Sequence, residues 1–213
     1  MLKTRGRAIL YLCAGFIFSG ISCSLYLSCG LGSDAFNMMT QGVSMALGIQ
    51  EGNAFYVIQG AMLLMVLALR RREIGPGTLF GSFLTGFVMN LWSTVLTPVL
   101  APAAFGTRLC CIAAAPVFTG LGITLVKKSG FGLLPCDILT LIFHSWLNRL
   151  QFRTVRILYD GAMFLTGLLL GGTFGIGTIL AVLLTGPCIQ LAASFLDGQA
   201  PGRRALTSPA RRG

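Results

Sequence analysis

The chain has 213 residues, of which 54% are hydrophobic and only 10% are charged, and its mean hydropathy is +0.80. Soluble domains carry about 25% charged residues, so this composition excludes an ordinary water-soluble domain. The net charge is +10, but the cations stand in short clusters between long apolar runs, which is typical of membrane-flanking loops and argues against nucleic-acid binding.

The apolar runs predict an all-α membrane protein. Basic residues at positions 3–7 precede a first apolar run, which we interpret as a retained span rather than a cleaved signal. Six segments are long and apolar enough to cross a bilayer, namely 8–28, 53–69, 77–99, 109–126, 155–171 and 176–196. Two shorter segments, 34–48 and 137–150, are predicted to be re-entrant or interfacial helices.

The basic clusters predict the topology, because cations favour the cytoplasmic side. With six spans, Arg70, Arg71 and Arg72 fall on the same side as the N-terminal cations. Crossing by both short segments would place these arginines outside, so the six-span model with both termini in the cytoplasm is favoured. Residues 1–196 then form a single transmembrane domain, and 197–213 form a disordered basic cytoplasmic tail.

An internal repeat runs through the chain with an offset of 100 to 103 residues. The matching positions are Gly30 and Gly130, Asp34 and Asp137, Gly60-Ala61-Met62 and Gly161-Ala162-Met163, Gly75-Pro76-Gly77-Thr78 and Gly175-Ile176-Gly177-Thr178, and Gly86 and Gly186. Each half holds three spans, so the second half must enter the membrane from the opposite side. The sequence therefore predicts two inverted repeats, about 8–99 and 109–196, of the kind found in transporters.

Three stretches carry a family resemblance: GLGSDAFNMMTQGVSMALGI, REIGPGTLFGSFLTGFVMNLW and GFGLLPCD. They resemble the YczE/YyaS/YitT group of bacterial membrane proteins, and the likeness is closest to the YczE branch and covers about residues 8 to 196. That group often has Pro-Trp before the first Asp, where this chain has Ser33 before Asp34. The resemblance implies a multi-pass protein of the bacterial inner membrane and implies no particular reaction.

Two polar pairs follow the Gly-rich turns of the repeat. Asp34 and Asp137 each precede an apolar helical stretch, where a carboxylate can cap the helix N-terminus or serve as a proton or cation site. Gln41 and His144 each lie seven residues later, on the same helix face as the Asp. His144 is either a packed residue or a pH-responsive gate or proton relay.

The remaining candidates lie inside spans. Asp160 aligns with Gln59 in the repeat and is costly to ionise there, so it either pairs with Arg156, four residues earlier, or serves substrate or protons. Asn90 and Gln190 align in the third span of each half, where interhelical hydrogen bonding is the plainer interpretation. A substrate or proton pathway between the halves is hypothesised to be lined by the polar residues of both groups: Asp34, Gln41, Gln59, Asn90, Asp137, His144, Asp160 and Gln190.

The sequence shows no enzyme signature, metal-ligand cluster, nucleotide loop or cofactor motif. We therefore expect a transporter or permease for an unknown small solute, with proton coupling as one option. The alternative is a membrane interaction or regulatory protein that supports a partner enzyme or assembly. Expected partners are the lipid bilayer and anionic headgroups at the basic loops, and a homo-oligomer is compatible with either function.

Overall fold

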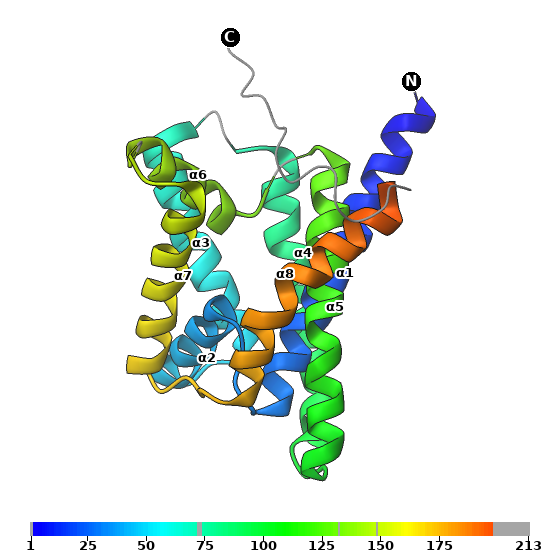
Figure 1. The fold of residues 1–213 in the computed structure, drawn as a ribbon, viewed down its shortest axis with the longest axis vertical. Helices are drawn as coiled ribbons and strands as arrows, with labels where there is room; N and C mark the ends of the chain where they lie inside the picture. Colours follow the sequence, from blue (N-terminus) through cyan, green and yellow to red (C-terminus); the bar gives the residue numbers. More distant parts are fainter. Residues whose placement is uncertain (1, 72–73, 132, 148, 198–213) are drawn as a thin grey trace.

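A computed structural model describes residues 2–71, 74–131, 133–147 and 149–197, and the regular structure within them is helical, as the sequence predicts (Figure 1). The helices are α1 (Leu2–Cys29), α2 (Ala35–Leu47), α3 (Glu51–Arg70), α4 (Pro76–Leu100), α5 (Phe105–Ser129), α6 (Pro135–Trp146), α7 (Phe152–Leu169) and α8 (Ile176–Asp197). The predicted tail after Asp197 lies outside the described residues.

Five helices, α1, α3, α4, α5 and α8, are long and apolar enough to cross a membrane. The chain is therefore a polytopic helical membrane protein. The predicted span 155–171 falls mostly on α7, which is not among the five and carries Arg153, Arg156 and Asp160. The two short segments form α2 and α6, which have 13 and 12 residues and lie at opposite ends of the molecule (Figure 1).

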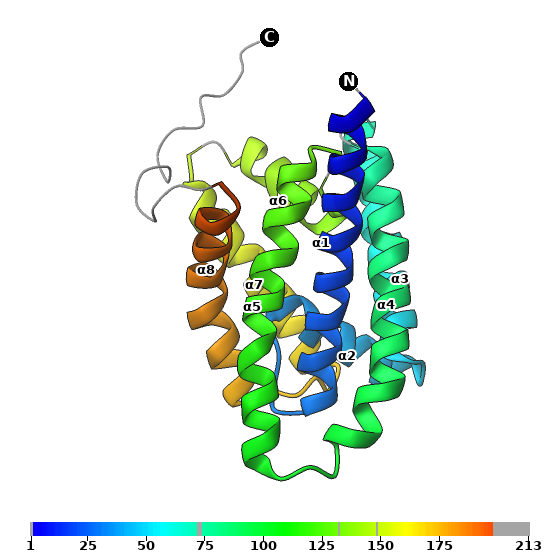
Figure 2. The same ribbon diagram turned by 90° about the vertical axis from the view of Figure 1, so that its right-hand side faces the viewer.

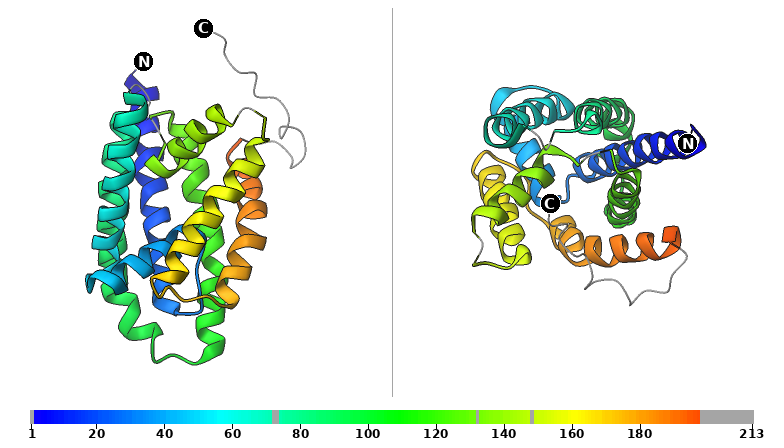
Figure 3. Two further views of the ribbon diagram at one scale, coloured as in Figure 1. Left: turned by 90° about the vertical axis from the view of Figure 1, so that its left-hand side faces the viewer. Right: turned by 90° about the horizontal axis from the view of Figure 1, so that it is seen from above.

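The helices form two groups (Figure 1). In the first, α1 packs between α4 and α5, and α8 packs against α5. In the second, α2 and α6 each contact both α3 and α7. Packing of α3 against α4 joins the groups at one edge, whereas no comparable packing joins α7 to α8 among the described residues (Figure 3).

Corresponding helices of the two halves run in opposite directions. This holds for α1 and α5, for α3 and α7, and for α4 and α8 (Figure 1). Gly30 and Gly130 follow the ends of α1 and α5 with φ of 60° and 70°, a left-handed conformation that glycine adopts without strain. The repeated glycine before each short helix therefore has the same structural cause in both halves.

A close helix contact occurs twice, once in each half. A Cβ added to Gly20 of α1 would lie 2.7 Å from the Cβ of Val88 on α4. A Cβ added to Gly120 of α5 would lie 2.7 Å from the carbonyl carbon of Cys188 on α8. Each residue of the second pair lies 100 positions after its counterpart in the first.

A hydroxyl contact beside these glycines also occurs twice. Ser24 of α1 donates to the carbonyl of Met89 on α4 at 3.0 Å. Thr124 of α5 donates to the carbonyl of Ile189 on α8 at 3.5 Å. The same offset of 100 relates the two contacts, so α1–α4 and α5–α8 are built from equivalent residues.

The turn between α7 and α8 is held by the first half of the chain. The amide of Gly177 donates to the carbonyl of Leu31 at 2.8 Å, which fixes the start of α8 to the segment before α2. A Cβ added to Gly167 of α7 would lie 2.5 Å from the carbonyl carbon of Met38 on α2. Both helices are thus anchored at the end where they meet.

Candidate functional site

Arg156 of α7 is the centre of a charged cluster. Its Nη1 lies 2.7 Å from Oδ1 of Asp137 on α6, and its Nε lies 3.0 Å from Oδ2 of Asp160, one helical turn along α7. The three side chains are 30–40% exposed. Because α6 docks against α7, one guanidinium holds a carboxylate from each helix.

A third carboxylate lies in the same electrostatic environment. Asp34 caps the N-terminus of α2, where Oδ1 accepts from the amide of Asn37 at 2.8 Å and Oδ2 accepts from its Nδ2 at 3.0 Å. Asp34 also interacts electrostatically with Asp160 and Arg156. The direct contacts of Arg156 are therefore with Asp137 and Asp160, and Asp34 acts on them only through longer-range electrostatics.

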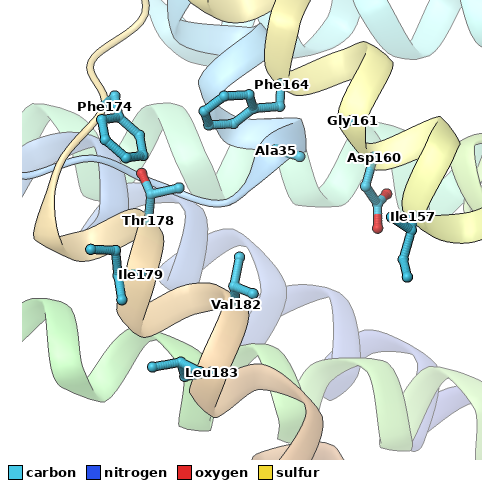
Figure 4. A pocket seen from close by; sticks show the side chains of 10 residues that line it. All are labelled: Ala35, Ile157, Asp160, Gly161, Phe164, Phe174, Thr178, Ile179, Val182 and Leu183. Carbon is cyan, nitrogen blue, oxygen red and sulfur yellow. The ribbon is translucent and has the colours of Figure 1, made fainter.

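A cavity of about 550 Å³ opens beside this cluster, between α7 and α8 (Figure 4). Its lining comes from the start of α2, from α7, from the turn after it and from α8: Ala35, Ile157, Asp160, Gly161, Phe164, Phe174, Thr178, Ile179, Val182 and Leu183. Asp160 is the one charged side chain among these lining residues. The size falls within the range of small-molecule sites, which are mostly apolar with a few polar groups.

The opposite edge, between α3 and α4, is closed by aromatic packing around Tyr56. The ring of Tyr56 stacks on that of Phe83 with centroids 6.0 Å apart, and its hydroxyl donates to the carbonyl of Phe83 at 3.0 Å. A Cβ added to Gly86 would lie 2.4 Å from the Tyr56 ring. No ligand-sized space is left where these two helices meet at Tyr56.

Several buried polar atoms inside the bundle have no hydrogen-bond partner among the described residues. They are the Tyr26 hydroxyl, Asn37 Oδ1, both amide atoms of Gln59, and the hydroxyls of Thr78, Thr85 and Thr178. Each belongs to a residue that is at most 6% exposed. Buried polar groups are usually paired, so these atoms are exceptions among the described residues.

Comparison with known proteins places the chain in a family. Residues 6–194 match the family model described as a family of unknown function, DUF6198. This chain belongs to DUF6198. It is 27% identical over 189 residues to the uncharacterized protein YyaS of Bacillus subtilis, covering 88% of this chain and 93% of that protein.

A second relative of this DUF6198 chain is an uncharacterized protein of Haemophilus influenzae. The two are 30% identical over 183 residues, covering 83% of this chain and 79% of the relative. No solved structure matches the chain. These relatives agree with the YczE/YyaS-like resemblance seen in the sequence, and their names give no activity.

The predicted site residues of this DUF6198 chain do not all meet. Asp137 and Asp160 both contact Arg156, Asp160 also lines the cavity, and Asp34 caps the neighbouring helix α2. Gln41 instead accepts from the amide of Thr173 at 2.7 Å, so it fastens α2 to the turn before α8. The ring of His144 packs edge-on against Phe152 at 5.5 Å, at the α6–α7 connection.

The other predicted residues are spread through the molecule. Gln59 is 2% exposed and lies within the buried polar interior. Gln190 is exposed on α8 and is not a lining residue of the cavity. Asn90 donates to Asn53 at 3.2 Å.

Asn90 belongs to a separate polar pocket of about 320 Å³ between α3 and α4. The pocket is lined by Ser44, Gln50, Glu51, Asn90, Ser93, Thr94, Thr97 and Pro98. Within it, the hydroxyl of Ser93 donates to the carboxylate of Glu51 at 3.3 Å. None of these residues lines the larger cavity, so Asn90 and Asp160 serve different places in the fold.

The cap interpretation is right for one aspartate and wrong for the other. Asp34 caps α2 as predicted, but the residue that caps α6 is Leu134, and Asp137 stands in the first turn. The insertion before Asp137 moves its carboxylate past the helix end, where it reaches Arg156. The predicted Arg156–Asp160 pair is present, but the contact between Arg156 and Asp137 depends on how α6 docks.

Proposed function

We propose that this DUF6198 chain is a non-enzymatic carrier of small solutes, built from two inverted halves that share one binding cavity. The observation that carries the proposal is the 550 Å³ cavity, which combines the start of α2 from the first half with α7 and α8 from the second. One carboxylate, that of Asp160, lines it. Carriers with inverted repeats commonly hold their substrate at such a place between the repeats.

Equivalent contacts in the two halves support the inverted repeat. The Gly20–Val88 and Gly120–Cys188 contacts use residues 100 positions apart, and the helices that carry them run in opposite directions. Two segments that merely share a composition would have no reason to reproduce the same contacts. The pairing of helices supports it too, since α2 contacts α7 as α6 contacts α3.

The two edges between the helix groups suggest how such a carrier works. One edge is closed by Tyr56 and Phe83, while the repeat places Ile157 and Leu183 at the open edge. If the halves exchange conformations, α7 closes onto α8 while α3 parts from α4. Binding at one edge is then followed by release at the other, which is alternating access through exchange of the repeats.

The basic residues support an orientation with both termini in the cytoplasm of a bacterial cell. The C-terminal ends of α3 and α5 carry Arg70, Lys127 and Lys128 and lie at the same end of the molecule as the N-terminus (Figure 2). Cations concentrate on the cytoplasmic side of membrane proteins. A reporter inserted in the turn at 171–175 is expected to be extracytoplasmic.

Transport by purified protein in liposomes tests the proposal. Uptake and efflux are measured across a panel of cationic, neutral and anionic solutes, with and without a pH gradient. We expect at least one solute to move, Asp160→Asn to reduce its rate at least tenfold, and Glu51→Gln, in the separate polar pocket, to leave it unchanged. Proton coupling predicts that the pH gradient changes the rate for wild type.

Two outcomes count against the carrier. Absence of movement across the whole panel by folded protein overturns it and favours the membrane regulatory role. Equal loss of rate in Asp160→Asn and Glu51→Gln overturns the site, because only one of these carboxylates borders the cavity.

A further inference from the structure

The cavity opens sideways, on the surface where a membrane protein meets lipid. Its rim is made of exposed apolar side chains, among them Ile157, Val182 and Leu183, which are 61%, 76% and 63% exposed. In a bilayer such side chains face hydrocarbon. A ligand with apolar substituents therefore reaches the cavity from the lipid without crossing a polar barrier.

Two aromatic rings form part of the wall. Phe164 of α7 and Phe174 of the α7–α8 turn pack edge to face, with centroids 5.8 Å apart and planes at 89° (Figure 4). Both line the cavity. Aromatic faces attract cations through the ring quadrupole, and ions with bulky or delocalised charge also lose little hydration when they bind.

Asp160 is the one charged side chain among the residues that line the cavity. Its Oδ2 is engaged by Arg156, which also contacts Oδ1 of Asp137. Oδ1 of Asp160 accepts no hydrogen bond from the described residues. A carboxylate oxygen without a hydrogen-bond donor at an apolar cavity favours a cation there and disfavours an anion.

The geometry points to an amphipathic organic cation as the ligand of this cavity: a quaternary ammonium, phosphonium or protonated amine with apolar substituents, its charge near Asp160 and its substituents against Phe164 and Phe174. This inference rests on the proposed carrier function and names its substrate class. A polar neutral solute finds few partners in a lining dominated by hydrocarbon, and an anion meets the carboxylate of Asp160.

Two ions of matched size and opposite charge test the inference. Tetraphenylphosphonium and tetraphenylborate share their shape, so their difference in binding to full-length protein in detergent reports charge preference. We expect saturable binding of the phosphonium and binding of the borate at least tenfold weaker. Asp160→Asn is expected to weaken phosphonium binding about tenfold and to leave borate binding equal or stronger.

A glycine pair related by the repeat provides the steric control. A Cβ added to Gly161 or to Gly60 meets nothing within 4 Å, so a side chain can be introduced at either position without a clash at its Cβ, but only Gly161 lines the cavity. Gly161→Leu is expected to weaken phosphonium binding at least tenfold, and Gly60→Leu to leave it unchanged. Phe164→Leu is expected to weaken it about fivefold through lost cation–π attraction.

Equal affinity for the two ions, undiminished phosphonium binding in Asp160→Asn, or no saturable binding of either ion overturns the inference. Transport of a hydrophilic solute by protein that does not bind the phosphonium keeps the carrier and removes this ligand class. Phosphonium binding without any transport keeps the ligand site and removes the carrier. The two proposals therefore fail on different results.

Discussion

The edge between α3 and α4 and the edge between α7 and α8 occupy repeated positions in the sequence and differ in packing. At the first, Tyr56 stacks on Phe83 and touches Gly86. At the second, the repeat places Ile157 and Leu183, which leave a cavity between them. The packed edge therefore has two aromatic rings where the open edge has two aliphatic side chains. The two edges thus share their place in the repeated sequence pattern and differ in the side chains that meet there.

The charges differ between the halves in the same way. In the repeat, Arg156 and Asp160 correspond to Phe55 and Gln59, which are 1% and 2% exposed. An aromatic ring and a neutral amide can be buried there, whereas the charged pair lies at the margin of the cavity, 38% and 40% exposed. The charged pair thus lies in the second half, whose edge between α7 and α8 holds the cavity.

The glycines Gly86 and Gly186 give the largest expected contrast between the edges. A Cβ on Gly86 would lie 2.4 Å from the Tyr56 ring, but a Cβ on Gly186 meets nothing within 4 Å. Gly86→Leu is expected to lower the free energy of unfolding by about 3 kcal/mol through overpacking. Gly186→Leu is expected to change it by no more than about 0.5 kcal/mol. Denaturation of the two variants in detergent measures the contrast.

Transport by Gly186→Leu then separates a static cavity from an alternating one. If α7 closes against α8 as α3 packs on α4, a side chain at position 186 blocks closure and uptake falls although the fold is intact. Normal uptake by this variant would show that transport does not require a small residue at position 186. The proposed mechanism, in which α7 closes onto α8, would then be wrong.

The second comparison concerns Arg156, which pairs with two carboxylates and corresponds to the uncharged Phe55 in the first half. Arg156→Leu leaves Asp137 and Asp160 repelling each other, and we expect a loss of about 2 kcal/mol in the free energy of unfolding. Partial exposure of the three side chains keeps this below the cost of breaking a fully buried pair. Arg153→Leu, an exposed arginine on the same helix, is the control. Equal stability of both variants would show that the cluster contributes nothing to folding.

Asp34 and Asp137 carry the third contrast, since one caps a helix and the other does not. Asp34→Ala removes the cap of α2 and is expected to cost about 1 kcal/mol, while Asp34→Asn keeps a capping oxygen and costs little. Asp137→Asn is expected to weaken the contact with Arg156 without loosening the start of α6. Hydrogen exchange at the first turns of α2 and α6 distinguishes these effects, and faster exchange in α6 alone would contradict them.

The hydroxyl of Tyr56 gives the smallest effect. Tyr56→Phe removes the bond to the Phe83 carbonyl but keeps the stacked rings, so a loss of about 0.6 kcal/mol is expected. Tyr11→Phe on α1 is the control. A loss several times larger, measured by the same denaturation, would mean that the hydroxyl, rather than the ring, closes this edge.

Much of the frame could be predicted from the sequence because it depends on local chemistry. Pro76 opens α4 after Gly75, Gly30 and Gly130 end α1 and α5, and Asp34 caps α2. The Arg156–Asp160 pair follows from a spacing of one helical turn. These features depend only on neighbouring residues, so the sequence alone is enough to predict them.

The rest of the site depends on how helices dock. Gln41 and His144 match in the repeat, yet Gln41 binds the turn before α8 and His144 packs on Phe152, because their surroundings have diverged. The contact of Asp137 with Arg156 requires α6 to lie against α7. The cavity is a lack of packing between two helices, and no single residue signals it.

The anchoring of the α7–α8 turn limits how this edge can move. The start of α8 is tied to Leu31 by the amide of Gly177, and Gly167 near the end of α7 lies against Met38 of α2. Both contacts lie at the turn, so we expect any separation of α7 from α8 to be larger at their opposite ends. Such a motion would widen the mouth of the cavity with distance from the turn. A ligand would then enter or leave at the end of the cavity that lies farthest from these backbone contacts.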